Sequence, residues 1–159
     1  MQSRAAEVRP AVDTDFPVIA RMAAEDPGVV AHTAYTYWVL QAMAADAVLV
    51  VPDAGEGLAG YVVGVYPFQP EAALLLQIVV APDRRRTGVG GALVTEFGRR
   101  AATRGCRRLL LTIDASNEVS EGFFHGFAEQ RGWPLALAGS TGTLDGLLDP
   151  ERIWELGLP

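Results

Sequence analysis

The chain has 159 residues, half of them hydrophobic and 20% charged, a balance typical of a folded globular protein. This length allows one hydrophobic core and is short for two, so we expect residues 1–159 to form a single domain. The formal net charge of −6 argues against a protein that binds nucleic-acid phosphates. It favours a cationic small molecule, such as an amine, as the partner.

Cysteine content and the length of the apolar runs bear on where the protein works. The single cysteine, Cys106, forms neither an internal disulfide nor a zinc site by itself, which favours a cytoplasmic protein. The first residues lack the apolar core of a signal peptide. The longest apolar run, residues 72–81, is interrupted by Gln77 and is too short to span a bilayer. We therefore expect neither a membrane nor a metal ion among the partners.

The first half of the chain alternates between apolar runs and turn residues. Asp13 and Asp15 are well placed to cap a helix through their side chains, because apolar residues follow at helical spacing. The pattern predicts a short strand over residues 7–12, a helix after residue 15, a second helix over 34–44, and strands over 47–51 and 58–66.

The second half begins with a turn at residues 66–70 and an apolar central strand over 73–80. A helix then runs to about residue 104 and ends at Gly105, a residue typical of helix C-termini. There follow a strand over 108–113, a helix over 117–130, and closing strands over 135–138 and 152–156 joined by a glycine-rich turn region. The order β-α-α-β-β-β-α-β-α-β-β predicts a mixed α/β fold.

The junction between the central strand and the next helix carries the strongest functional signal. The strand ends at Pro82, three arginines follow, and Gly88, Gly90 and Gly91 precede the helix. Backbone N–H groups at a helix start are unpaired, the helix dipole adds positive charge there, and absent Cβ atoms allow close approach of an anion. This arrangement predicts a site for a phosphorylated cofactor.

The glycine spacing narrows the kind of phosphate loop. Gly88-x-Gly90-Gly91 lacks the third glycine of a dinucleotide fingerprint, and the Gly-Lys-Ser/Thr of a P-loop is absent. The segment Arg85-x-x-Gly88-x-Gly90 resembles the pyrophosphate loop of the GNAT N-acetyltransferases, whose Gln/Arg-x-x-Gly-x-Gly/Ala segment holds coenzyme A. The alternative interpretation is a glycine-rich helix start beside solvated arginines.

A second segment is similar to the same family. In GNAT enzymes a strand ends in a short loop and an asparagine caps the helix that follows. A small residue lies three positions after the asparagine, and an aromatic residue four positions after that. Asn117, Ser120 and Phe124 hold these places. The resemblance covers about residues 7–156. It implies a single-domain α/β (α+β) fold, with a mixed, mostly antiparallel sheet, a splayed strand pair and helices on both faces.

Within the family the chain is most similar to the L-2,4-diaminobutyrate acetyltransferases of ectoine synthesis. In that group Leu-Asp-x-Asn-Ser-x-Tyr-x-Tyr precedes the second helix, and the central strand reads Trp-Gln-Val. Both tyrosines are present here as Tyr35 and Tyr37, and the glutamine is Gln77. The departures are Val30 for the aspartate, His32 for the asparagine and Leu76 for the tryptophan.

The resemblance implies acetyl-CoA as the acyl donor, with no metal. The strand backbone would pair with pantetheine and polarise the thioester, and the loop amides and Arg85 would neutralise the pyrophosphate. Many relatives protonate the departing thiolate with a tyrosine where this chain has Phe124, so that role is vacant here. The implied cofactor-binding residues are Ile78, Val79, Val80, Arg85, Arg86, Thr87, Gly88, Val89, Gly90, Gly91, Asn117, Ser120 and Phe124.

The implied reaction is direct attack of a neutral amine on the thioester, which requires positioning and proton transfer. Asp114 could hold an ammonium group or accept its proton through water, or it could cap its own loop. Gln77 is a polar group on an apolar strand and needs partners, either the substrate or the strand gap. Candidate catalytic residues are Asp114, Tyr35 and Gln77; candidate substrate-binding residues are His32, Tyr35, Tyr37, Gln77, Asp114 and Glu121.

The expected function is transfer of acetyl from acetyl-CoA to a primary amine of a small molecule, with a diamino acid such as L-2,4-diaminobutyrate as candidate. The enzyme is expected to be a cytoplasmic homodimer. One alternative is a non-catalytic acyl-CoA-binding or regulatory domain, which the missing acid at Phe124 favours. The other is a protein or peptide N-acetyltransferase, which the acidic composition weakens.

Overall fold

A computed structural model describes residues 6–142 and 150–159 of the chain. In chain order the elements are β1 (Arg9–Pro10), a 3₁₀ helix (Asp13–Asp15), α1 (Phe16–Glu25), α2 (Ala34–Met43), β2 (Val48–Pro52), β3 (Leu58–Gln69), β4 (Ala72–Val80), a second 3₁₀ helix (Pro82–Arg84), α3 (Val89–Thr103), β5 (Arg108–Asp114), α4 (Glu118–Arg131), β6 (Leu135–Ser140) and β7 (Glu151–Gly157). The predicted order of helices and strands is confirmed. The turn expected between the last two strands falls on residues 143–149, outside the described residues.

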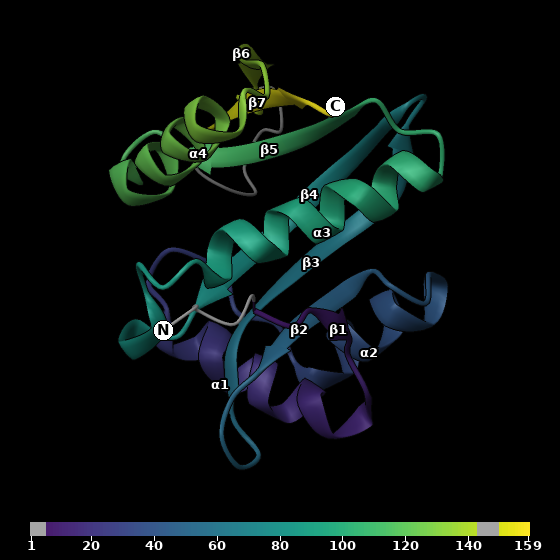
Figure 1. The fold of residues 1–159 in the computed structure, drawn as a ribbon, viewed down its shortest axis with the longest axis vertical. Helices are drawn as coiled ribbons and strands as arrows, with labels where there is room; N and C mark the ends of the chain where they lie inside the picture. Colours follow the sequence, from purple (N-terminus) through teal and green to yellow (C-terminus); the bar gives the residue numbers. More distant parts are fainter. Residues whose placement is uncertain (1–5, 143–149) are drawn as a thin grey trace.

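The seven strands form one sheet in the order β1-β2-β3-β4-β5-β7-β6. Neighbouring strands are antiparallel except β4 and β5, which run parallel across the crossover helix α3. The last strand, β7, inserts between β5 and β6 (Figure 1). The predicted mixed, mostly antiparallel sheet is therefore confirmed, and helices α3 and α4 lie along β3–β4 and β5–β7 respectively (Figure 1).

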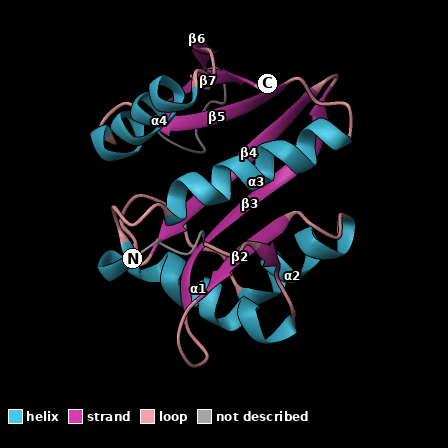
Figure 2. Ribbon diagram, viewed as in Figure 1, coloured by secondary structure: helices cyan, strands magenta, loops and turns pink. Residues whose placement is uncertain are grey.

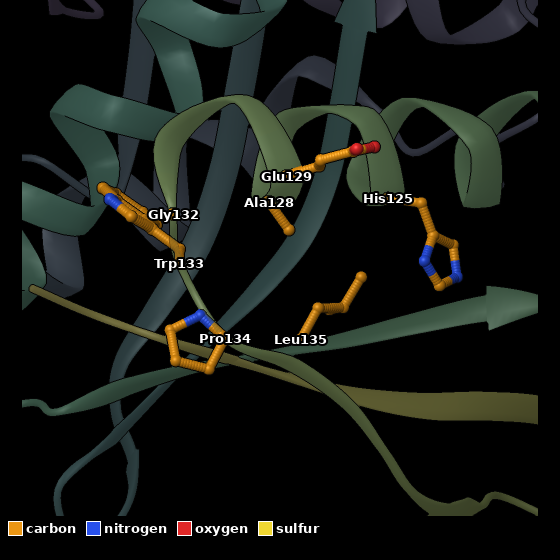
Figure 3. A pocket seen from close by; sticks show the side chains of 7 residues that line it. All are labelled: His125, Ala128, Glu129, Gly132, Trp133, Pro134 and Leu135. Atoms are coloured by element: carbon orange, nitrogen blue, oxygen red, sulfur yellow. The ribbon is translucent and has the colours of Figure 1, made fainter.

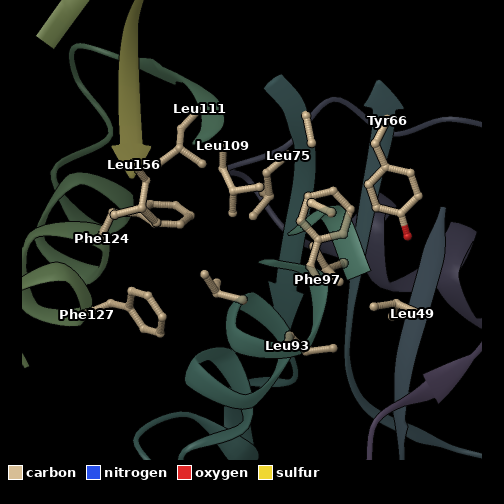
Figure 4. Packing of buried hydrophobic residues seen from close by; sticks show 14 of the residues in the cluster. Leu49, Tyr66, Leu75, Leu93, Phe97, Leu109, Leu111, Phe124, Phe127 and Leu156 are labelled. Atoms are coloured by element: carbon tan, nitrogen blue, oxygen red, sulfur yellow. The ribbon is translucent and has the colours of Figure 1, made fainter. Parts of the chain in front are cut away.

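Helices cover both faces of the sheet, as predicted. Successive residues of β2 point to opposite faces, so Leu49 packs in one hydrophobic cluster and Val48 in another. The first cluster joins the sheet to α3 and α4 through Phe97 and Phe124 among others (Figure 4). The second joins the opposite face to α1 and α2, with Tyr37 fully buried in it. No helix within the described ranges is long and apolar enough to cross a membrane.

The two central strands separate partway along their length. Their parallel pairing ends at Leu75 and Leu111. On the other side of β4, Leu75 pairs with Gly64 and Gln77 with its neighbour Val63, so the intervening Leu76 is an extra residue, a β-bulge. A bulge bends its strand, and Figure 2 shows β4 and β5 diverging toward the starts of α3 and α4. This confirms the predicted splay.

Two expected boundaries near the hairpins are wrong. The strand predicted to end at residue 66 continues as β3 to Gln69, and the hairpin tip is Pro70–Glu71. The ladder tolerates Pro67, which has no N–H to donate, because the register shifts between Val65 and Gln69. The first strand is only Arg9–Pro10, a short edge strand, rather than residues 7–12.

The expected side-chain capping of the first helix is also wrong. Asp15 makes no capping hydrogen bond to α1. Its Oδ2 instead accepts from the backbone N–H of Val12 at 2.8 Å and from Nη1 of Arg9 at 2.7 Å. Arg9 and the N–H of Val12 thus occupy the two carboxylate oxygens that could otherwise accept from the first turn of α1. Asp15 therefore ties the helix start to β1.

A buried ion cluster fastens the far end of α3 to the segment before β2. The Asp46 carboxylate lies 2.6 Å from Nη2 of Arg104 and 3.3 Å from Nη1 of Arg100. The Arg104 guanidinium lies 4.3 Å from the centre of the Tyr66 ring, which stacks on Phe97 at 5.0 Å. Burial disfavours the charged form of Asp46, but hydrogen bonds from the two arginines outweigh it and lower the pKa of this carboxyl.

Candidate active site

The glycine turn forms an anion cradle at the start of α3. Gly88 is the N-terminal capping residue of α3 and has φ of +90°, a conformation that glycine adopts without strain. Its carbonyl accepts the first helical hydrogen bond, from Ala92 at 3.0 Å, so the N–H groups of residues 89–91 have no partner within the helix. A Cβ at Gly88 would meet no atom within 4 Å. The space above these amides is therefore open to a phosphate.

Helix α4 packs against this first turn through Phe123. A Cβ built on Gly90 would lie 3.0 Å from Cε2 of Phe123 and 3.6 Å from Cγ2 of Val80. Gly90 thus permits the close approach of α4, while Gly88 leaves room for an anion. Sequence reasoning missed Phe123 because its neighbour fills the family's aromatic position. The spacing of four to Phe127, on the same helix face, was the available signal.

Phe124, the expected cofactor residue, is buried in the hydrophobic core. Only 4% of it is exposed, and it packs near Leu156 and Leu111 (Figure 4). The ring that faces the first turn of α3 is that of Phe123. Neither ring carries a dissociable proton, so neither supplies the acid that would protonate a thiolate.

The arginines before the glycines have different environments. Arg84 is held by Asp53, with Nε to Oδ2 at 2.8 Å and Nη2 to Oδ1 at 3.0 Å. Arg86 is exposed and has φ of +60°. The Thr87 hydroxyl donates to the carbonyl of Arg84. Arg84 is therefore committed to the protein, whereas Arg86 is available for an anion.

Arg85 folds back over the end of β4. Its Nε lies 3.4 Å from the carbonyl oxygen of Val80, and its Nη2 lies 3.6 Å from Oδ2 of Asp26, beyond the end of α1. Both contacts are at the long limit for a charge-assisted hydrogen bond. The guanidinium is half-exposed and loosely held, so a pyrophosphate can draw it away at little cost.

The splayed strand offers a backbone edge to a ligand. On one side, Ile78, Val79 and Val80 pair with residues 60–62 of β3. On the other side the pairing with β5 has already ended at Leu75. The exposed edge of β4 therefore leads from the anion cradle toward the bulge, and it presents N–H and C=O groups along that path.

Asn117 caps α4 as the sequence predicts. Its Oδ1 accepts from the N–H of Ser120 at 3.2 Å. Its Nδ2 lies 3.5 Å from the carbonyl oxygen of Gly28, in the loop between α1 and α2. In the same loop, Oδ1 of Asp26 accepts from the N–H of Gly28 at 2.7 Å. This short segment therefore touches both motifs expected to hold the cofactor, and nothing in the sequence pattern indicated this.

Gln77 lies at the centre of a buried hydrogen-bond network. Its Oε1 accepts from the hydroxyls of Tyr37 at 2.9 Å and Tyr61 at 3.3 Å, and its Nε2 donates to the carbonyl of Val30 at 2.5 Å. The N–H of His32 donates to the Tyr37 hydroxyl at 3.4 Å. The structure thus brings together three predicted residues and adds Tyr61. The side-chain amide of Gln77 therefore links the loop before α2 to β4 through the carbonyl of Val30.

Tyr35 lies apart from this network. Residues two positions apart on a helix face different directions, and Tyr35 is 71% exposed, with its ring 5.9 Å from that of Trp38. The described residues give its hydroxyl no hydrogen-bond partner. Any contact between Tyr35 and a substrate would therefore be at the surface of α2.

The two other predicted acids are engaged within their own surroundings. Oδ1 of Asp114 accepts from the N–H and the hydroxyl of Ser116, at 2.7 and 2.5 Å, which lowers the pKa of this carboxyl. A carboxyl with a lowered pKa is a weaker base. Oε1 of Glu121 pairs with Nη1 of Arg152 on β7 at 2.7 Å. The loop-capping interpretation of Asp114 is the one the geometry favours.

A surface hollow lies elsewhere, between the outer face of α4 and β6. His125, Glu129, Trp133 and Leu135 contribute to its lining (Figure 3). None of the residues expected to hold a cofactor lines it. The candidate site is therefore the unpaired stretch of β4, where this strand diverges from β5 beside the starts of α3 and α4.

Comparison with known proteins supports this assignment. Residues 16–127 match the sequence model of the acetyltransferase (GNAT) family. The chain belongs to this family. It is 32% identical over 157 residues to the L-2,4-diaminobutyric acid acetyltransferase of Streptomyces coelicolor, covering 94% of this chain and 90% of the relative. The predicted resemblance, including the similarity to diaminobutyrate enzymes, is confirmed.

Solved structures share the fold. Diaminobutyrate acetyltransferase from Paenibacillus lautus, in complex with L-2,4-diaminobutyric acid and coenzyme A, superposes with a TM-score of 0.81, at 23% identity over 96% of this chain and 94% of that one. Ribosomal-protein-alanine N-acetyltransferase from Brucella melitensis superposes with a TM-score of 0.68, at 18% identity over 96% and 99%. The same fold therefore serves acetyltransferases with different acceptors.

Family membership makes the chain an acyltransferase whose acyl donor is acetyl-CoA. The residues present fit that donor. The open space above Gly88 suits a pyrophosphate, and the unpaired edge of β4 over residues 78–80 suits the extended pantetheine arm. Among the described residues no group of three or more His, Cys, Asp or Glu side chains could hold a metal ion.

Proposed function

We propose that the chain transfers the acetyl group of acetyl-CoA to a primary amine of a small diamino acid, with L-2,4-diaminobutyrate as the leading candidate. The observation that carries the proposal is that the anion cradle at Gly88 follows directly on a strand, β4, whose edge toward β5 is unpaired over residues 78–80. The near full-length similarity to a diaminobutyrate enzyme supports the choice of acceptor. The acidic net charge suits a cationic substrate.

The proposed chemistry depends mainly on positioning. Acetyl-CoA, when bound, supplies the thioester that the amine attacks. The helix-start amides and Arg85 hold phosphate charge, and backbone N–H groups near Ile78 stabilise the developing oxyanion. As the N–C bond forms and the C–S bond breaks, solvent accepts the proton that the amine loses and, since Phe124 offers none, supplies the proton to the departing thiolate. The network around Gln77 holds the loop between α1 and α2, residues 26–33, in place; we call this segment the acceptor loop. The geometry favours this role for Gln77 over direct contact with the substrate.

The expected site residues are carried forward as proposals, with roles weighted by their placement. The cofactor set over residues 78–80 and 85–91 lines one continuous path. We assign Asp114 the role of holding the loop before α4 through Ser116, rather than that of a general base, because the pKa of this carboxyl is lowered. Tyr35 is retained as a substrate contact at the surface of α2. His32 is assigned to the acceptor loop, and Tyr37, on α2, is assigned to holding that loop through the N–H of His32.

An assay of free thiol with an amine panel tests this function. We expect release of coenzyme A to depend on the added amine and to be fastest with L-2,4-diaminobutyrate or a close diamino acid. Mass spectrometry should show one acetyl group added to the amine. Thiol release that does not change with any amine or peptide would contradict the proposal.

Two alternatives have specific support. Phe124 in place of an acid favours a non-catalytic acyl-CoA-binding domain, which would bind acetyl-CoA tightly without amine-dependent turnover. The shared fold with a ribosomal-protein acetyltransferase leaves a peptide acceptor as the other candidate. Peptides with free N-termini belong in the panel for this reason.

We further propose that residues 1–159 form one domain and that the enzyme is a cytoplasmic homodimer without nucleic-acid or membrane partners. The buried free thiol of Cys106 suits a reducing compartment. The outermost strand, β6, exposes Leu137 and an unpaired backbone edge, which suits association with a second copy. Light scattering during gel filtration tests the oligomeric state.

A further inference from the structure

The acceptor needs a carboxylate, and the expected ones are already in use. A diamino acid reacts through one neutral amine, so its second amine stays protonated and requires a negative partner. Asp114 is held by Ser116, and Glu121 is paired with Arg152. The departure from the related enzymes at Val30 removes an acid from the same loop, and the carbonyl of Val30 is bound to Gln77.

Asp26 is another carboxylate beside the cofactor loop. It lies in the loop that touches the two cofactor motifs, and its side chain is only 17% exposed. The same loop continues to Val30, whose carbonyl accepts from Nε2 of Gln77 in the buried network on β4. Asp26 is therefore a residue of the acceptor loop that contacts the cofactor loop.

The ion-pair partner of Asp26 is Arg85, which the phosphates of the cofactor would attract away from it. Oδ1 is used by the N–H of Gly28 at 2.7 Å, whereas Oδ2 faces only the long contact to Nη2 of Arg85, at 3.6 Å. Arg85 is also the arginine of the pyrophosphate loop. A guanidinium forms shorter, bidentate hydrogen bonds with a phosphate than the contact seen here. Because a phosphate offers Arg85 shorter and more numerous bonds than this contact, we expect binding of the cofactor to draw the guanidinium away and expose Oδ2.

We propose that Asp26 binds the non-reacting ammonium group of the acceptor and that Arg85 blocks this carboxylate until acetyl-CoA draws the arginine away. This inference rests on the proposed function for the nature of the acceptor. It adds a specificity residue that sequence patterns did not indicate, and it gives the cofactor loop a second task. It explains how a chain without an acid at residue 30 still selects a diamine.

Calorimetry with coenzyme A tests the inference without requiring turnover. We expect L-2,4-diaminobutyrate to bind wild type at least about tenfold more tightly when coenzyme A is present, as expected for one charged hydrogen bond. Asp26→Asn should abolish this gain, because the amide keeps Oδ1 for Gly28 but loses the charge. Glu25→Gln, which removes an exposed charge one residue earlier, is the matched control and should keep it.

Two further measurements sharpen the result. Arg85→Gln should let the diamine bind without coenzyme A, since the carboxylate is then free. In turnover, Asp26→Asn should lower kcat/KM for the diamine about tenfold to a hundredfold, and change it far less for whichever of 4-aminobutyrate or 2-aminobutyrate is acetylated. Affinity of Asp26→Asn for acetyl-CoA should be unchanged or higher.

The possible outcomes separate the two proposals. Equal losses for diamine and monoamine, or a diamine affinity that coenzyme A does not change, would overturn the role of Asp26 while leaving an amine acetyltransferase in place. Weaker binding of acetyl-CoA to Asp26→Asn would overturn the blocking contact. Coenzyme A-dependent binding of the diamine without turnover of any amine would instead contradict the proposed function and support the assignment of Asp26.

Discussion

At the scale of single residues, positions that are adjacent or nearly adjacent in the sequence lie in different environments, one facing the site and the other packed against the protein. Gly88 leaves open space where a side chain would be, while Gly90 is filled by the ring of Phe123. Phe123 and Phe124 are adjacent, yet one faces the cofactor helix and the other the core. The family motif names the type of residue at each place, and only packing decides what each one does.

Replacing Gly88 with alanine should weaken binding of acetyl-CoA. Alanine at this position must adopt the φ of +90° that the turn requires, which costs about 1–2 kcal/mol of stability for an L-residue. Its Cβ also occupies space beside the amides at the start of α3. Gly55→Ala is the matched control, since Gly55 also has a positive φ and open surroundings but lies in the β2–β3 turn. Both variants should lose stability in denaturant titrations, and only Gly88→Ala should lose affinity. If both variants bound acetyl-CoA with equal affinity, the Gly88 turn would not be the site that holds the pyrophosphate.

The adjacent phenylalanines should separate stability from activity. Phe124→Ala empties a buried site and should lower the free energy of unfolding by about 3–5 kcal/mol. Phe123→Ala removes a half-buried ring and should cost less, but it should raise KM for acetyl-CoA because the ring lines the first turn of α3. Urea unfolding and initial rates measure the two effects. The reverse ranking in unfolding would show that the core is arranged around Phe123.

At the scale of elements, two polar groupings fasten helices and loops to the sheet, one beside the splayed part of β4 and one at the far end of α3. The network around Gln77 ties the loop before α2 to β4, and the cluster around Asp46 ties α3 to the segment before β2. The network around Gln77 is buried, and the buried Asp46 carboxylate faces two partly exposed arginines, so each grouping links residues that are distant in sequence.

Removing the hydroxyl of Tyr37 should loosen the acceptor loop. Tyr37→Phe leaves one bond fewer to Gln77 and none for the N–H of His32, at a cost of about 1 kcal/mol. We expect a higher KM for the amine and little change in KM for acetyl-CoA. Tyr35→Phe, on the exposed side of the same helix, should raise KM for the amine far less than Tyr37→Phe does. A larger loss of kcat in Tyr35→Phe would instead assign a catalytic hydroxyl to Tyr35.

Stability should depend on the charge of Asp46. The pKa of this carboxyl is lower in the folded state, so its contribution is present above the unfolded value of 3.8 and is lost as the pH falls through the folded value. Asp46→Asn should therefore cost about 1–3 kcal/mol at pH 7. The difference from wild type should shrink below pH 3.8. Thermal unfolding across this range measures it, and a constant difference would show that the loss is one of packing.

At the scale of the whole molecule, the sequence predicts the order of elements and the central cofactor unit well. Periodicity and turn residues are local signals, so they place α3, β4 and the cap at Asn117. They do not show that β7 inserts between β5 and β6, since strand pairing joins residues far apart in sequence. The same limit hides two contacts: Asp26, after α1, meets Arg85 of the cofactor loop, and Tyr61 of β3 bonds to Gln77 of β4.

Binding of the cofactor should stabilise the molecule as a whole. A ligand at a hundred times its Kd adds about 2.7 kcal/mol to the stability of the folded state. For a chain of this size that corresponds to a rise in Tm of roughly 5–10 °C. Scanning fluorimetry with acetyl-CoA measures the shift, and adenosine without the phosphates should give none. A similar rise with adenosine alone would place the binding energy outside the anion cradle.

The bulge at Leu76 has a consequence for engineering. Repairing the register of β4, by deleting this one residue, would let the ladder with β3 continue and would straighten the strand toward β5. Such a variant should gain sheet hydrogen bonds and close the gap into which the donor fits. Efforts to make this enzyme more heat-resistant should therefore leave that irregularity alone, because its incomplete strand pairing is what admits a substrate.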